Sequence, residues 1–192
     1  MTHKKGSQVH LTFKEEILEA INGANEIAGS LMEAVTRLVT HAVRKASEIG
    51  MSVIEATGDV VRAAMQVAFE IGGDLGATAK AVVIGVLRGS QEISTEIFKV
   101  LSSTVACIVK SSAEAAGDVG SAAKGAVQGA IEGAKELGLD VEEAASQAAT
   151  GAVRAAYDIS AELGAKVREA VTGTISGVKV VLKEPFKPGK KQ

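Results

Sequence analysis

Residues 136–143 read Glu-Leu-Gly-Leu-Asp-Val-Glu-Glu, a stretch that combines the end of one helix with the start of the next. Gly138 can adopt the left-handed conformation that closes a helix, and Leu139 can make the hydrophobic contact that accompanies it. Asp140, followed three residues later by Glu143, has the capping-box pattern that begins a helix. The stretch therefore predicts two antiparallel helices joined by a short turn.

The same stretch belongs to a 22-residue repeat with seven full units over residues 26–179. The first position of each unit is acidic and the second is apolar, at Glu26–Ile27, Glu48–Ile49, Glu70–Ile71, Glu92–Ile93, Glu114–Ala115, Glu136–Leu137 and Asp158–Ile159. Units 44 residues apart are more alike still, since residues 73–76 and 79–80 (GDLG, AK) return as residues 117–120 and 123–124 (GDVG, AK). The structural unit is therefore expected to be a pair of 22-residue segments.

The period of the repeat is helical, because 22 residues make six turns at about 3.67 residues per turn. The apolar positions of a unit cover an arc of about 160° on a helical wheel, and no strand-like alternation competes with them. Such an arc is wider than a coiled-coil seam. It suits a helix that touches two neighbours or lies on an apolar surface.

The junctions between units decide between short helices and one continuous helix. Five of the seven carry a glycine next to an N-cap residue: Gly29-Ser30, Gly50 with Ser52, Gly73-Asp74, Gly117-Asp118 and Gly138 with Asp140. We expect breaks at most junctions, with helices near 13–27 and over 30–49, 52–71, 74–93, 96–115, 118–137, 140–159 and 162–182. The alternative is a helix that continues through some junctions, since an interior glycine costs only about 1 kcal/mol.

These features predict an all-α protein, built as a row or closed bundle of about eight antiparallel helices. Residues 1–12 are expected as an N-terminal extension and residues 13–182 as a single helical-repeat domain. Both prolines, Pro185 and Pro188, fall within residues 183–192. This last segment is expected as a flexible basic tail.

Small residues recur at positions 16 and 20 of the units, counting Glu26 as position 1. The pairs are Gly85 and Gly89, Cys107 and Ser111, Gly129 and Gly133, Gly151 and Ala155, and Gly173 and Gly177. Small residues four apart lie on one helix face and let two backbones approach closely. Because every unit also carries charges, this pattern predicts tight packing between neighbouring helices rather than a membrane glycine zipper.

No chemistry-bearing motif emerges from the sequence. The histidines His3, His10 and His41 have no suitably spaced metal-ligating neighbour, and His41 is expected at the edge of the core or in solvent. Cys107 lies in an apolar run and is expected as a small buried side chain. Glu15, Glu16 and Glu19 near Lys14 are expected on a solvated face, as are Glu132, Lys135 and Glu136. We therefore predict no catalytic, cofactor-binding or metal-binding residues.

The acids at the first position of each unit would lie near helix C-termini, where the helix dipole disfavours negative charge. We expect them to pair with basic residues such as Arg37, Lys80 and Lys124, or to serve solubility. The formal net charge of −2 and an aromatic content of 3% argue against nucleic-acid binding. Neither a secretory signal nor a membrane-spanning run is evident, so a cytoplasmic location is expected.

In repeat length, residues 26–179 resemble proteins built from 11- or 22-residue amphipathic units, namely exchangeable apolipoproteins, late-embryogenesis-abundant proteins and granule-coating phasins. The chain lacks the proline that punctuates apolipoprotein units. Its positive mean hydropathy, +0.21, differs from that of hydrophilic desiccation proteins. The resemblance identifies no functional residue.

The preferred hypothesis is a non-enzymatic scaffold that forms homo-oligomers or binds another protein, because stacked repeats bury a continuous core. The alternative is a surface-active protein whose apolar arc coats lipid or polymer granules. A third hypothesis, an enzyme or ligand carrier with a pocket between helices, rests only on the capacity of helical bundles to hold cofactors.

Overall fold

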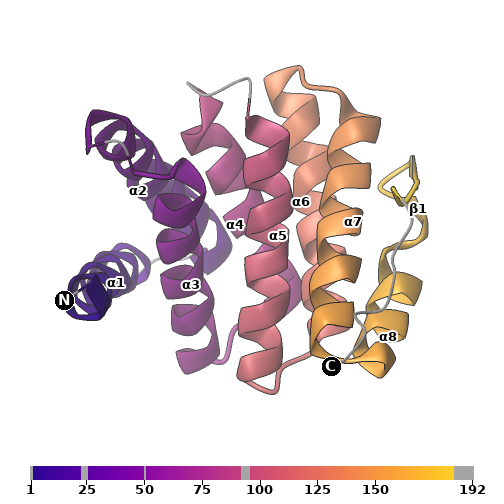
Figure 1. Ribbon diagram of the computed structural model, residues 1–192, viewed down its shortest axis with the longest axis horizontal. Helices are drawn as coiled ribbons and strands as arrows, with labels where there is room; N and C mark the ends of the chain where they lie inside the picture. The colour runs from indigo at the N-terminus through magenta and orange to yellow at the C-terminus, as the bar shows by residue number, and fades with distance from the viewer. Residues whose placement is uncertain (1, 23–25, 50, 92–95, 184–192) are drawn as a thin grey trace.

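The computed structural model describes residues 2–22, 26–49, 51–91 and 96–183, with backbone alone for residues 2–11. Most of the tail expected at 183–192 thus lies outside the described residues. Within the described part there are eight helices and one antiparallel pair of strands (Figure 1). The elements are α1 (Thr2–Ile21), α2 (Ile27–Ile49), α3 (Val53–Glu70), α4 (Leu75–Gly89), α5 (Ile97–Glu114), α6 (Val119–Leu137), α7 (Val141–Ile159), α8 (Ala161–Val171), β1 (Gly173–Ile175) and β2 (Val178–Val180).

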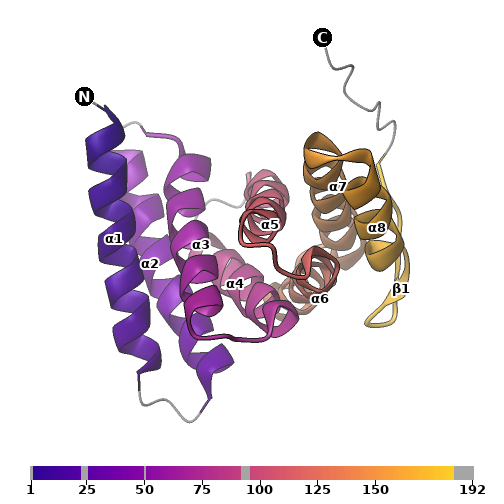
Figure 2. The same cartoon turned by 90° about the horizontal axis from the view of Figure 1, so that it is seen from below.

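The helices form a row of two layers, which confirms the predicted all-α helical-repeat architecture. Each helix from α1 to α7 packs most extensively on the helix two places away in the chain, so that α4 lies between α2 and α6, and α5 between α3 and α7. Odd-numbered helices make one layer and even-numbered helices the other, with α1 and α2 at one end and α8 at the opposite end (Figures 1 and 2). This arrangement explains the 44-residue similarity, because segments 44 residues apart occupy the same layer.

The core follows from the apolar arc of each unit. It is one continuous cluster made largely of buried alanine and valine, and it extends from Ile17 on α1 to Val180 on β2. Small side chains fill it because helices of one layer approach closely. The arc is therefore covered by helices on two sides, which is the first of the two arrangements that its width allows.

The junction at residues 136–143 is a helix break, as predicted. Gly138 has φ 67° and ψ 26°, and the backbone N–H of Leu139 donates to the carbonyl of Ala134 at 2.9 Å. Asp140 caps α7 by accepting from the N–H of Glu143 at 2.9 Å. The carboxylate of Glu143 also accepts a hydrogen bond from the ammonium group of Lys183, and this contact holds the segment after the last strand against α7.

Side-chain caps also begin three further helices. Asp74 accepts from the N–H of Ala77 at the start of α4, and Asp118 accepts from that of Ser121 at the start of α6. Ser160 caps α8 through the N–H of Leu163 at 3.1 Å, although this junction has no glycine. A polar cap is therefore sufficient to end one helix and begin the next here.

Glycine has a different role at the α5–α6 junction from the one the sequence suggests. The left-handed residue there is Ala116, with φ 54°. A Cβ at Gly117 would lie 2.6 Å from Leu75 Cδ1 and 2.8 Å from Phe69 Cε1. Gly117 is thus required by the packing of α3 and α4 rather than by its own backbone angle.

Two predictions near the N-terminal end are wrong, and a third, the helix start at Ser52, is correct in position but not in its capping bond. The first helix spans Thr2–Ile21 rather than 13–27, so from Thr2 onward the expected extension 1–12 is helical. The break expected at Gly29-Ser30 lies inside α2, because the helix already begins at Ile27 and the N–H of Ser30 donates to the carbonyl of Glu26. Ser52 stands at the N-cap of α3 but makes no side-chain capping bond.

The last helix was also predicted too long, since α8 ends at Val171 and an antiparallel hairpin replaces the rest of 162–182. Ser176 and Gly177 both have positive φ, 49° and 81°, which is the geometry of a two-residue hairpin turn. Isoleucine and valine flank this turn and favour strands. Gly173 therefore begins β1 and Gly177 lies in the hairpin turn, so neither belongs to the helical small-residue pattern.

Candidate functional site

Small residues at position 16 lie at close contacts between helices of one layer. A Cβ at Gly129 on α6 would lie 2.6 Å from the carbonyl oxygen of Lys80 on α4, and a Cβ at Gly151 on α7 would lie 2.6 Å from that of Ser102 on α5. Cys107 on α5 occupies the same position, 3.8 Å from the carbonyl oxygen of Gly58 on α3 and 49 residues later in the chain. The predicted tight packing is confirmed, and position 16 marks the face that stacks on the preceding helix of the layer.

Helix α2 is the exception, because no even-numbered helix precedes it. Its positions 12, 16 and 20 are Arg37, His41 and Lys45, and all three are exposed. The same positions are Ala81, Gly85 and Gly89 in α4, and Gly125, Gly129 and Gly133 in α6, all of them buried. His41 is exposed to solvent, which is one of the two environments expected for it, whereas the sequence pattern did not identify Arg37 and Lys45 as part of the same exposed face.

A groove of about 1520 Å³ lies beside this face, between α1, α2 and α3. We call it the N-terminal groove. Its buried apolar lining consists of Ala34, Leu38, Ala42 and Ala56, and Phe13 on α1 is partly buried. Ile49 and Met51, 64% and 43% exposed, add an accessible apolar rim where α2 leads into α3. Because the first four of these residues are buried, the accessible apolar surface of the groove comes mainly from Ile49, Met51 and the partly buried Phe13.

The charged side chains that line the N-terminal groove differ in sign from one helix to the next. Helix α1 contributes Glu16 and Glu19, whereas α2 contributes Arg37, His41 and Lys45. Helix α3 contributes a second set, Glu55, Asp59 and Arg62, in which the guanidinium of Arg62 forms an ion pair with Asp59. One wall is thus acidic and the facing helix basic, an arrangement that would orient a charged occupant.

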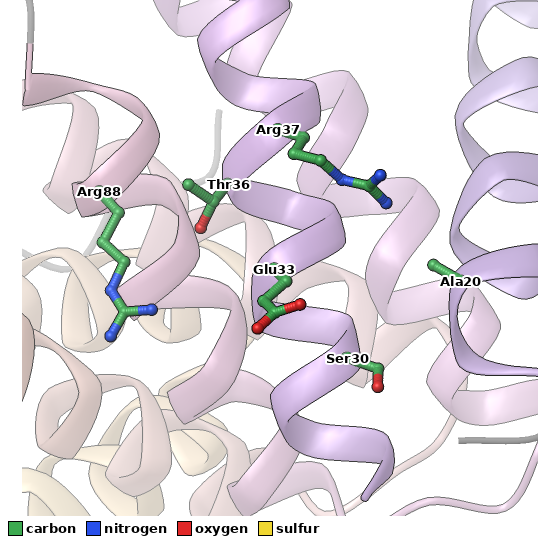
Figure 3. A pocket seen from close by; sticks show the side chains of 6 residues that line it. All are labelled: Ala20, Ser30, Glu33, Thr36, Arg37 and Arg88. Atoms are coloured by element: carbon green, nitrogen blue, oxygen red, sulfur yellow. The ribbon is translucent and has the colours of Figure 1, made fainter.

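A smaller pocket of about 430 Å³ lies on the other side of Arg37. Figure 3 shows Arg37 extending from α2 towards α1, which carries Ala20, while Arg88 reaches the pocket from α4. Ser30, Glu33 and Thr36 of α2 complete its lining. Arg88 already pairs with Glu136 on α6 at 2.8 Å, so much of its charge is engaged in holding α4 to α6.

Cys107 lies at the edge of the core rather than in a reactive setting. Burial raises the pKa of its thiol above the ordinary value, and the nearby Arg62 only partly opposes this effect. A raised pKa keeps the thiol protonated at neutral pH, and the protonated form is the less nucleophilic one. This environment agrees with the predicted small, apolar role of Cys107.

Ion pairs link neighbouring helices of a layer. Two acids from the first position of the repeat are paired, Glu70 with Lys14 at 2.6 Å and Glu136 with Arg88. Lys80, expected to pair with such an acid, instead bridges to Glu132 at 2.7 Å. These two acids are therefore paired as expected, but with Lys14 and Arg88 rather than with the bases named from the sequence, because the stacking of neighbouring helices decides which charges meet.

Within the described ranges, no group of three or more His, Cys, Asp or Glu residues is arranged to hold a metal ion. The side chains of His3 and His10 lie outside the described residues. None of the helices in the described part combines the length and hydrophobicity needed to span a membrane.

Comparisons with known proteins support the fold alone. No protein-family model matches the sequence, and no curated protein is significantly similar to it. Among solved structures, the chain is similar to the de novo designed helical repeat protein DHR7, with a TM-score of 0.53 and 21% sequence identity. The alignment covers 86% of this chain and 91% of that one. The likeness therefore extends over most of both chains and concerns the stacked helical-repeat architecture.

Proposed function

We propose that this protein is a non-enzymatic interaction scaffold that binds a protein segment in the N-terminal groove. The observation that carries the proposal is a contrast in packing: the central helices α4 and α6 are in close contact, whereas α1, α2 and α3 leave an open groove. Between α4 and α6 the backbones approach so closely that a Cβ at Gly129 would overlap its neighbour. Between α1, α2 and α3, a groove of about 1520 Å³ stays open over buried alanine and leucine.

The chemistry of the groove suits a peptide or helix rather than a small reacting substrate. Apolar surface at the rim, from Ile49 and Met51, would supply affinity, and the charged walls would select orientation. A helix laid in an apolar groove is a recurring mode of protein recognition. Stacked helical repeats commonly bind partners along extended surfaces of this kind.

The experiment compares two isoleucines at position 2 of the repeat. Ile49 lines the groove and Ile159 lies outside it, and both are well exposed at helix ends. We expect the apolar dye anilinonaphthalene sulfonate to bind the wild-type protein, and Ile49→Glu to weaken binding by roughly tenfold, the cost of about 1.4 kcal/mol. Ile159→Glu should leave the dye affinity unchanged. Equal dye binding by the two variants would show that the groove is not the apolar binding site.

The surface-coating alternative has support from one observation. Isoleucines at position 2 are exposed at helix ends along one long edge of the row, with Ile27 48%, Ile71 41% and Ile159 45% exposed. The wider apolar arc, however, is already buried between helices. A surface-active protein would bind neutral phosphatidylcholine vesicles and lose that binding in Ile71→Glu. Failure to float with such vesicles would exclude this alternative.

A further inference from the structure

Even-numbered helices stack on one another through a face that carries positions 12, 16 and 20 of the repeat. A Cβ at Gly85 of α4 would lie 2.8 Å from the carbonyl oxygen of Met32 on α2. A Cβ at Gly89 would lie 2.8 Å from the carbonyl oxygen of Thr36 on the same helix. The corresponding face of α2 has no preceding helix in its layer among the described elements, and it lines the N-terminal groove. Because the groove continues a helix-to-helix interface, a helix is its expected occupant.

The side chains on this face of α2 are long and basic. Arg37, His41 and Lys45 stand where α4 has an alanine and two glycines. They are four residues apart, so they follow one helix face over about 12 Å. Within the described ranges, no acid forms an ion pair with any of the three. Such side chains hold a neighbouring helix further from α2 than glycine would, and they favour acids on that helix.

The wall that α1 contributes is acidic, through Glu16 and Glu19. Both helices also carry charges of the opposite sign, Lys14 on α1 and Glu33 and Glu48 on α2, but none of these is among the described lining residues of the groove. Lys14 instead pairs with an acid of α3 at 2.6 Å, and Glu33 lines the smaller pocket. The described lining of the groove therefore has bases on α2 and acids on α1.

We propose that the partner segment is an amphipathic helix of another protein, whose apolar stripe lies between an acidic flank and a basic flank. The acidic flank lies against the three bases of α2, with its acids four residues apart to match their spacing. The basic flank lies against the glutamates of α1. The apolar stripe contacts Phe13, Ile49 and Met51, which supply the accessible apolar surface. This inference rests on the proposed function and specifies the chemistry of its partner.

The two walls also select against partners that carry charge of one sign. A helix with acids on both flanks would bring acids against the glutamates of α1, and a helix with bases on both flanks would bring bases against those of α2. Like charges that meet across an interface lower the affinity for the wrong partner. Specificity therefore comes from pairing both flanks at once.

The test uses three fluorescently labelled synthetic peptides of about 18 residues, or about five helical turns. All three share one leucine stripe on an alanine background. The mixed probe has glutamate at every fourth residue of one flank and lysine at every fourth residue of the other. The acidic probe has glutamate on both flanks, and the basic probe has lysine on both. Fluorescence anisotropy with the full chain, in about 50 mM salt to limit screening, measures the affinity of each.

The wild-type protein should bind the mixed probe roughly tenfold more tightly than either of the others, because several exposed charge pairs of modest strength add together. The double variant Arg37→Glu, Lys45→Glu makes both walls acidic, so it should prefer the basic probe. The matched control, Lys110→Glu with Arg154→Glu, changes the net charge equally at exposed positions outside the described lining of the groove. It should keep the wild-type preference. Circular dichroism melting of each variant checks that it is folded.

Equal affinities for the three probes, no binding of any probe, or an unchanged preference in the groove variant would each overturn the proposed partner chemistry. A changed preference in the control would overturn it too, because net charge and not the groove would then set the ranking. Dye binding that depends on Ile49 would still support the groove in these cases, so the two failures are distinct. A groove variant that melts far below the wild type is replaced by Arg37→Gln with Lys45→Gln, which should lower the preference for the mixed over the basic probe.

Discussion

Replacing a glycine of this protein with a larger residue should change the free energy of unfolding in opposite directions at different positions, depending on which atoms the added side chain would contact. Gly129 lies in α6 against the backbone of Lys80 and the side chain of Val83. Gly58 lies in α3, where a Cβ would meet only the end of the Arg62 side chain, at 3.5 Å. Both are interior helix positions, so both carry the same cost in helix propensity. Only the contact with the neighbouring helix distinguishes them.

Gly129→Ala should lower the free energy of unfolding by about 1–2 kcal/mol, because overpacking outweighs the gain in helix propensity. Gly58→Ala should raise it by up to about 1 kcal/mol, since the propensity gain is unopposed. Urea denaturation of both variants measures the difference. Stabilisation by both substitutions would mean that α4 and α6 are not in close contact at Gly129.

At the scale of the secondary-structure element, the start of a helix depends on a short side chain that caps its N-terminus. Asp118 accepts hydrogen bonds from the backbone N–H of Ser121 at 3.2 Å and from its hydroxyl at 3.0 Å. These bonds favour the ionised carboxylate and lower the pKa of Asp118 below its usual 3.8. The cap is therefore strongest when Asp118 is charged, and α6 begins at this residue.

Asp118→Ala should cost about 1 kcal/mol at pH 7, the usual value of an N-cap. Because the pKa is lowered in the folded state, the ionisation of Asp118 stabilises the protein fully above pH 3.8 and progressively less as pH falls below it. Thermal melting between pH 7 and pH 2.5 should show a smaller acid-dependent loss in the variant than in the wild type.

Asp158→Ala is the matched control, since this exposed acid lies in the last turn of α7 and caps no helix. Removing a negative charge there should be neutral or slightly stabilising at pH 7. A loss at pH 7 equal to that of Asp118→Ala would contradict the assignment of a specific capping role to Asp118.

At the scale of the whole molecule, each helix needs a neighbouring helix, or another cover, on both sides within its layer. Interior helices such as α4 have neighbours on both sides, and α7 has the hairpin and the residues after it on its outer side. In such a stack, stability is close to a sum of nearest-neighbour contacts, and the ends are the vulnerable points. The C-terminal segment thus protects apolar surface without adding a helix.

A chain ending at Val171 should melt several degrees below a chain ending at Lys183, because α7 and α8 lose the cover of Ile175 and Val180. Exposed apolar surface should also make the shorter chain associate in a concentration-dependent way. Differential scanning calorimetry and light scattering compare the two chains. Equal melting and equal mass would show that the hairpin does not act as a cap.

The helical repeat and most helix ends could be predicted, because their signals are local. Gly138 and Asp140 each determine the conformation of a few adjacent residues, and the structure has the break there. The hairpin was missed because Gly173 and Gly177 continue the spacing of the small residues, although the neighbouring β-branched residues favour strands. The early start of α2 was missed because Gly29-Ser30 has the capping pattern without acting as a cap.

The sequence alone determined that the chain is helical, that it repeats every 22 residues, and that its helices pack through small side chains. These properties depend on periodicity and on local backbone preference. Only the tertiary structure decided that helices two places apart pair most closely, and that α1, α2 and α3 leave a groove between them. Position 16 recurs in every unit, but where it lies in a helix its burial depends on whether another helix of the same layer precedes it. That is a property of the whole stack and not of any single repeat.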